Sequence, residues 1–145
     1  MGVIESHMVS VLVIIGGFIF AIMGVWHGLL SVIDVFRPTQ FAPVDDSVRL
    51  AMKSTGVRFS RGRANVWEAW LGFNISHGLG MFLFGAAAVW LGLNLEHVEV
   101  ARAVLAIPVV IGLIYFLLSV RFWFYAPAAG SAVATACFVA AWWSY

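Results

Sequence analysis

Two histidines lie in long apolar stretches of the chain, where ionisable side chains are rare. His27 and His77 each belong to an uncharged stretch, and Asn74 precedes His77 by three residues. Residues three and four apart share one face of a helix, so Asn74 and His77 fall on one stripe of a helical segment. An ionisable residue inside a membrane is costly without a partner and marks a functional site by default. The pattern therefore predicts a polar site of two imidazoles and a carboxamide.

Other polar side chains continue these faces at helical spacing. The ligand-binding candidates are His27, Ser31, Trp70, Asn74, Ser76 and His77. Such a face between apolar helices is typical of a pocket for a lipid, a quinone or another small amphipathic molecule, with histidine as hydrogen-bond partner or acid–base group. In a second interpretation, the histidines only join packed helices of a structural or assembly subunit. In a third, His27 and His77 hold a haem b or a metal ion in a redox protein; otherwise no cofactor is predicted.

A second group of polar residues is expected at one membrane surface. Asp34 follows the first uncharged stretch, Glu68 precedes the second, and Arg121 follows the third. These helix ends lie at comparable heights in an antiparallel arrangement, and charged residues near a membrane tend to pair with one another. An ion pair between Glu68 and Arg121 is expected to join two helices, and binding of a lipid headgroup by Arg121 is the alternative.

The elements that position these residues follow from composition. Of the 145 residues, 63% are hydrophobic and 10% are charged, against about 45–50% and 25% in soluble domains. Four stretches reach the roughly 18 apolar residues that a membrane-spanning helix needs. The predicted spans cover residues 8–36, 66–95, 100–122 and 127–145, with a loop at 37–65. Because helices satisfy their own backbone amides in lipid, we expect an all-α, up-and-down bundle of four transmembrane helices in a single membrane domain, residues 1–145.

Local signals predict several helix boundaries. Pro38 follows the first span, Asn65 is placed to cap the second, and Pro127 is expected to open the fourth. Pro108 lies early inside the third span. A kink is expected at this proline, which membrane helices tolerate when neighbouring groups satisfy the freed carbonyl.

The 37–65 loop is expected to hold a short amphipathic helix. Asp45 and the two residues after it form a helix start, and Gly56 forms a stop. Basic residues beside a span attract anionic lipid headgroups by roughly 1 kcal/mol each. Anionic headgroups, or alternatively another anionic ligand, are therefore the expected partners of Arg58, Arg61 and Arg63. The loop lacks the interleaved aromatic residues of a nucleic-acid binder, so no nucleic-acid partner is expected.

The basic residues also predict an orientation. All of the eight Lys and Arg residues except Arg102 fall on the side of the 37–65 loop. The positive-inside rule makes that side cytoplasmic. Both termini, and the short loop that contains Glu96 and Glu99, are then expected outside.

Three motifs carry a resemblance to a known family. They read GVWH at 24–27, WEAWLGFNISHG at 67–78 and RFWFYAP at 121–127. The chain resembles an uncharacterised family of small bacterial four-helix integral membrane proteins, and the GFNxSHG run with its matching histidine in the first span is the most specific part. The resemblance implies the fold and a location in the bacterial inner membrane. The family has no assigned activity, so no catalytic residue is carried over.

No motif in the sequence assigns a catalytic residue. A Ser–His–carboxylate set, HExxH, a cysteine cluster and a glycine-rich phosphate loop are all absent from the sequence. Glycine and alanine are abundant on several helix faces, and small residues let membrane helices approach closely. Membrane lipids, a homo-oligomer or a larger membrane complex are therefore the expected partners.

Overall fold

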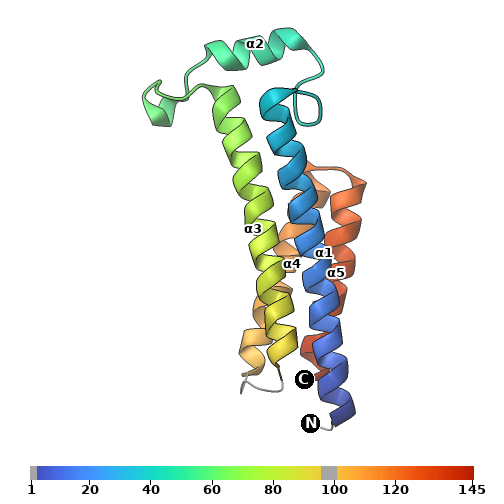
Figure 1. The fold of residues 1–145 in the computed structure, drawn as a ribbon. Coiled ribbons are helices and arrows are strands. Elements are labelled where there is room, and N and C mark those ends of the chain that lie inside the picture. The colour runs from blue at the N-terminus through green and yellow to red at the C-terminus, as the bar shows by residue number, and fades with distance from the viewer. Residues whose placement is uncertain (1–2, 96–100) are drawn as a thin grey trace. The chain divides into compact units, whose positions relative to one another are not determined.

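The computed structural model describes residues 3–95 and 101–145. Within these residues the fold is all-α and 84% helical, with a short helix between the first two long ones. The elements are α1 (Val3–Phe36), α2 (Asp46–Ser54), the 3-10 helix η1 (Arg58–Ser60), α3 (Val66–Asn94), α4 (Arg102–Phe122) and α5 (Tyr125–Ser144) (Figure 1). The loop predicted to carry Glu96 and Glu99 outside lies beyond the described residues.

Four of these helices are long and apolar enough to cross a membrane. The candidate spans in α1, α3, α4 and α5 contain 32, 29, 21 and 20 residues, and a spanning helix needs about 20. In lipid each backbone amide must be satisfied within the protein, which a helix does along its own length. The predicted fold class is confirmed, and the chain is an integral membrane protein with four spans.

The helix ends follow the local signals with two differences. The Oδ1 atom of Asn65 accepts a hydrogen bond from Glu68 N at 2.8 Å, which caps α3 as predicted. Helix α5 begins at Tyr125 instead of at Pro127, because a first helical turn tolerates a residue without an N–H group. Helix α1 starts at Val3 instead of residue 8, with Glu5 in its first turn, where a negative charge favours the helix dipole.

The chain forms two compact units. The four-helix unit comprises Met1–Met23 and Met81–Tyr145, and the histidine unit comprises Gly24–Gly80. In the four-helix unit, each long helix contributes one ring to an aromatic cluster. The ring centroid of Phe20 lies 4.9 Å from that of Phe84, 5.4 Å from Tyr115 and 6.2 Å from Phe138.

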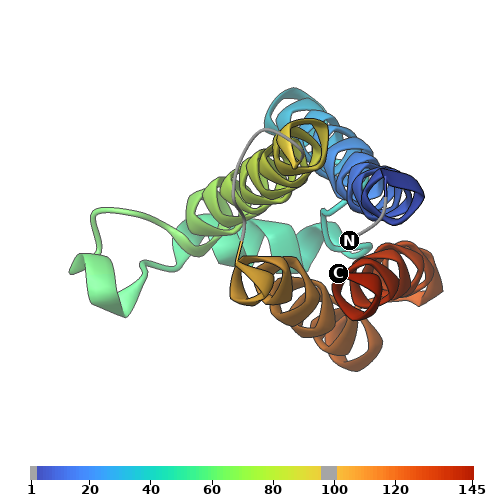
Figure 2. The ribbon, with the colours of Figure 1, turned by 90° about the horizontal axis from the view of Figure 1, so that it is seen from below.

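The helices of the four-helix unit alternate in direction. The start of α1 and the end of α5 lie at the same end of this unit (Figure 1), and Figure 2 shows the unit end-on. Glycine permits close contact here, because a Cβ atom at Gly85 would lie 2.5 Å from Gly17 O. This close approach of α1 and α3 is the small-residue packing typical of membrane helices.

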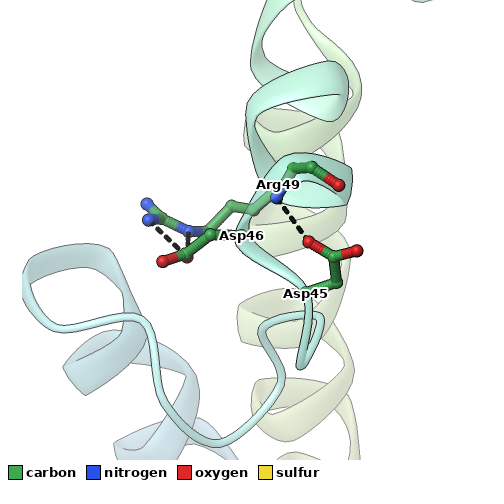
Figure 3. A network of polar contacts seen from close by, with 4 residues as sticks. Asp45, Asp46 and Arg49 are labelled. Carbon is green, nitrogen blue, oxygen red and sulfur yellow. Dashed lines mark hydrogen bonds and ion pairs between the residues drawn. The ribbon is translucent and has the colours of Figure 1, made fainter.

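The histidine unit contains the end of α1, the linker with α2 and η1, and the start of α3. The predicted short helix is confirmed as α2, which buries no residue. Asp45 caps it by accepting a hydrogen bond from Ser47 N at 2.8 Å, and this contact with Ser47 lowers the pKa of the Asp45 carboxyl. One turn further, the Arg49 guanidinium pairs with Asp46 at 2.8 Å (Figure 3).

Candidate functional site

The site in the histidine unit is built on a close approach of α1 and α3. A Cβ atom at Gly78 would lie 2.7 Å from Gly28 N and 3.0 Å from Gly24 O. The two backbones therefore touch where only a hydrogen fits between them. His27 directly precedes Gly28, and His77 directly precedes Gly78. Contact between the glycines thus brings the two histidines side by side.

The two imidazoles form an aromatic group with two phenylalanines. The ring centroids of His27 and His77 lie 5.1 Å apart, with the rings edge to face. Phe41 lies 4.6 Å from His27, and Phe73 stacks on His77 at 5.9 Å. Both histidines are half-buried, while Phe73 is 58% exposed. The pair is therefore shielded on one side and reachable on another.

Asn74 adds a buried carboxamide to the pair. Its side chain is fully buried, and Nδ2 donates a hydrogen bond to Trp70 O at 2.9 Å. The carboxamide also interacts electrostatically with the His27 imidazole. Among the described residues, no donor makes a hydrogen bond of ordinary geometry to Asn74 Oδ1. A carboxamide beside an imidazole offers both donors and an acceptor, which are groups that can also bind a hydroxyl, a carbonyl or an N–H group.

The linker after α1 folds back over the histidines, and Asp34 holds it there. The Asp34 carboxylate is fully buried and accepts backbone N–H groups from Thr39 at 2.8 Å, Gln40 at 2.9 Å and Phe41 at 2.6 Å. Trp70 Nε1 donates to Phe41 O at 2.9 Å. The linker is thus fastened to both α1 and α3, and the Phe41 ring is placed against His27.

Phe41 is the residue of the site that sequence reasoning missed. It lies in a loop, where helical spacing gives no information on which way a side chain points. The one signal in the sequence is an aromatic residue between Pro38 and Pro43.

The serine candidates bond to their own helices. Ser31 is fully buried, and its hydroxyl donates to His27 O at 2.8 Å. Ser76 is exposed, and its hydroxyl donates to Phe73 O at 2.9 Å. Such bonds to a preceding carbonyl are the usual state of a serine within a helix. The structure brings Ser31, Trp70, Asn74 and both histidines into one region, and leaves Ser76 outside it.

Of the expected surface group, Asp34 is the residue with observed partners, and these are the linker amides described above. Glu68 is exposed at the start of α3 in the histidine unit. Arg121 belongs to the four-helix unit, where its guanidinium lies 5.0 Å from the centre of the Phe122 ring. The ion pair between Glu68 and Arg121, and headgroup binding by Arg121, therefore stay predictions.

The geometry of the histidine pair bears on the haem and metal alternative. Axial ligation of a haem iron by both residues requires one imidazole on each side of the porphyrin. The observed rings meet edge to face, which leaves no space for a porphyrin between them. Within residues 3–95 and 101–145, no group of three His, Cys, Asp or Glu side chains is arranged to hold a metal ion.

Comparison of the chain with protein-family models, with curated proteins and with solved structures found no match. Its four long apolar helices support the coarser part of the resemblance drawn from the motifs. On this basis the chain is a small four-span membrane protein, and no family is assigned.

Proposed function

We propose that the protein binds a lipid, a quinone or another small amphipathic molecule at the face formed by His27, Asn74 and His77. The observation that carries the proposal is the contact of two imidazoles, 5.1 Å apart, beside a fully buried carboxamide in apolar helices. Polar side chains are expensive in this environment and are retained there mainly for function. Their donors and acceptors suit the carbonyl or hydroxyl group of an amphipathic ligand.

The exposure of the site supports entry from the bilayer. Both histidines are half-buried, and their neighbours Trp26 and Phe73 are 65% and 58% exposed. These apolar surfaces are compatible with the acyl or isoprenoid part of a ligand, and the imidazoles with its polar part. This combination of apolar walls and a few polar groups is the usual composition of a small-molecule site.

A second candidate function is structural, and the hydrogen bonds of the serines favour it. Ser31 and Ser76 donate to carbonyls of their own helices, and Asn74 Nδ2 does the same. In this case the histidines hold α1 and α3 together in a subunit that serves assembly. A hydrogen bond between membrane helices contributes about 0.6 kcal/mol.

The experiment that separates the two functions measures bound molecules and stability in the same variants. Lipids and quinones retained by the detergent-purified protein are identified by mass spectrometry, for the wild type, Asn74→Ala and His77→Ala. If the site binds a ligand, the wild type is expected to retain one kind of amphipathic molecule, at up to one copy per protein. The variants are expected to retain about tenfold less of that molecule. Ser76→Ala is the matched control, because Ser76 lies on the same helix, is exposed and bonds only to Phe73 O among the contacts described.

Two results contradict ligand binding. The first is a wild-type protein that retains no specific amphipathic molecule. The second is equal retention by the wild type, Asn74→Ala and His77→Ala while the variants only unfold at lower temperature, which supports the structural function instead. If His77→Ala does not fold, His77→Asn replaces it in the experiment, because asparagine keeps a polar side chain at this position.

We further propose that the protein lies in the inner membrane with its 37–65 linker in the cytoplasm and both termini outside. The exposed basic residues of the linker support this orientation through the positive-inside rule. Ser54→Cys in a Cys137→Ser background tests it, because Ser54 is exposed at the end of α2. A membrane-impermeant thiol reagent is expected to label this cysteine only after the cells are permeabilised. Labelling of intact cells contradicts the orientation.

A further inference from the structure

The 57–64 loop, which leads into α3, has a defined backbone. Gly56 pairs with Asn65 in an antiparallel bridge, and Val57 N donates to Ala64 O at 2.8 Å. Inside the loop, the Ser60 hydroxyl donates to Val57 O at 2.8 Å and accepts from Ala64 N at 3.1 Å. The loop is therefore closed at its base and held from within, so its outer side chains are presented by a fixed frame.

The turn of this loop uses two residues in the left-handed region. Arg61 has φ of 53° and Gly62 has φ of 81°. Glycine adopts such a value without cost, whereas arginine adopts it with some strain. The turn places an arginine at a position where asparagine or glycine is the easier choice, and thereby keeps a positive charge at the tip of the loop.

The loop concentrates positive charge around an exposed aromatic ring. Arg58, Arg61 and Arg63 are exposed, and among the described residues no carboxylate pairs with them. Phe59 is 98% exposed. No Asp or Glu lies between Ser47 and Trp67 in the sequence.

An open hollow lies beside this ring. Phe59, Ser60, Arg61 and Arg63 line it, and its volume is about 370 Å³. Two guanidinium groups and a hydroxyl at its wall are the donors that bind a phosphate group, since guanidinium pairs with phosphate through parallel N–H···O bonds. The phenyl ring adds an apolar wall, which free inorganic phosphate does not use.

The position of the loop in the chain brings it to the membrane surface. The candidate span of α3 begins at Val66, three residues after Arg63. A loop joined so closely to a spanning helix lies at the level of the lipid headgroups. There an exposed phenyl ring leaves water, and each basic side chain gains roughly 1 kcal/mol from anionic lipid.

We propose that the 57–64 loop binds the phosphate of an anionic glycerophospholipid of the same membrane, with Arg61 and Arg63 as ligands and Phe59 inserted among the headgroups. The site is separate from the His27, Asn74 and His77 face. It selects a lipid by its headgroup charge, whereas the histidine face selects an amphipathic molecule by hydrogen bonding.

The test compares the loss of two charges from the hollow with the loss of two charges elsewhere in the linker. The phosphatidylglycerol and phosphatidylcholine molecules that remain on the purified protein are counted by native mass spectrometry. Arg61→Gln with Arg63→Gln is expected to lower the preference for phosphatidylglycerol by about fivefold per arginine. Arg37→Gln with Lys53→Gln removes the same charge from two exposed residues outside the hollow and is expected to lower the preference clearly less, because charge is lost without loss of a phosphate ligand.

Three results overturn the proposal. Equal losses in both double variants show that net charge alone acts. A wild-type protein with no preference for phosphatidylglycerol shows that no such site exists. Displacement of the lipid by soluble glycerol phosphate at equal concentration shows a site for free phosphate instead of a site at the membrane.

A second measurement follows the depth of residue 59. Trifluoromethyl-phenylalanine at this position keeps the phenyl ring and reports its exposure through fluorine relaxation by a water-soluble gadolinium chelate. The label is expected to be shielded in anionic vesicles, and less shielded in the Arg61→Gln, Arg63→Gln background. The same label at Ser54, an exposed residue at the end of α2, is the control. Equal relaxation at 59 and 54 contradicts insertion.

Discussion

The two compact units bury polar side chains of different kinds. In the four-helix unit, the buried polar residues that the structure describes all carry hydroxyls, and two of them bond to their own helix: Ser131 donates to Pro127 O at 2.7 Å and Thr135 to Ser131 O at 2.6 Å. The histidine unit buries the carboxylate of Asp34 and the carboxamide of Asn74, beside two half-buried imidazoles. Buried hydroxyls bond to their own helix in both units, since Ser31 of the histidine unit does so too. The Asp34 carboxylate differs because its partners lie in the linker, and the Asn74 carboxamide differs because it bonds to its own helix and also lies beside the His27 imidazole.

This difference indicates which polar residues packing needs. In the four-helix unit, glycines and an aromatic cluster hold the helices together. In the histidine unit, the same two helices α1 and α3 also touch through glycine, at Gly78. Since glycine contact is sufficient for close packing of membrane helices, the imidazoles and the carboxamide are in excess of what packing requires. This excess is why the candidate site is assigned to the histidine unit.

The largest expected loss of stability comes from breaking the glycine contact of the four-helix unit. In Gly85→Ala the new methyl group meets Gly17 O at 2.5 Å and also the backbone of Ala21, so the helices must separate. Overpacking against rigid backbone costs about 3 kcal/mol. Thermal unfolding followed by tryptophan fluorescence measures the loss.

The control for this variant is Gly72→Ala, where no atom lies within 4 Å of the added Cβ. This change removes the unfavourable helix propensity of glycine and is expected to shift stability by less than about 1 kcal/mol, toward the folded state. Equal destabilisation by both substitutions contradicts the role given to the contact at Gly85.

The next largest loss of stability is expected from breaking the corresponding glycine contact of the histidine unit. In Gly78→Ala the methyl group lies 2.7 Å from Gly28 N, so α1 and α3 move apart and the unit loses about 2 kcal/mol. The His27 and His77 rings separate with them, which the ring-current shifts of the imidazole protons report in NMR spectra. Gly28→Ala, with open space at its Cβ, is the matched control. Unchanged imidazole shifts in Gly78→Ala contradict the link between the glycine contact and the histidine pair.

A smaller effect is expected from removing the Asp34 carboxylate that anchors the linker. In Asp34→Ala the three backbone amides of residues 39–41 lose their shared acceptor, which costs about 2 kcal/mol locally. We expect faster hydrogen exchange in these amides and little change in the unfolding temperature of the whole protein. Asp34→Asn retains one acceptor oxygen, so its exchange rates at these amides are expected to lie between those of the wild type and those of Asp34→Ala. Unchanged exchange at residues 39–41 in Asp34→Ala contradicts the anchoring role.

The histidine pair could be predicted from the sequence because both histidines lie in uncharged stretches and Asn74 precedes His77 at helical spacing. His27, Asn74 and His77 were predicted to form one polar site, and the ring centroids of the two histidines lie 5.1 Å apart. The cap at Asn65 and the start of α2 at Asp45 were readable from the local preference of these residue types. Each of these features depends on interactions within one helix, or on one helix contact.

The contacts of the linker could not be predicted from the sequence in the same way. Asp34 was expected to act in an ion pair or at a headgroup, yet its observed partners are three backbone amides. Every residue type except proline carries the same backbone N–H group, so a sequence does not show which amides pair with a carboxylate. That pairing depends on the path of the chain, which hydrophobic periodicity does not describe. The position of Phe41 against His27 follows from that path and was missed for the same reason.

The smallest expected effect concerns α2, which buries no residue and therefore belongs to neither packed interior. The contact with Ser47 lowers the pKa of Asp45, so the cap contributes fully above the ordinary carboxyl pKa of about 4 and is lost as the pH falls through the lower folded-state value. The amide of Ser47, followed by nitrogen NMR, is expected to lose its capped shift in acid. In Asp45→Asn the cap persists without titrating, because asparagine is an equally good cap. An identical acid transition in Asp45→Asn assigns the change to another group, while a loss of α3 signals at the same pH shows that α2 contributes to the packing of the histidine unit after all.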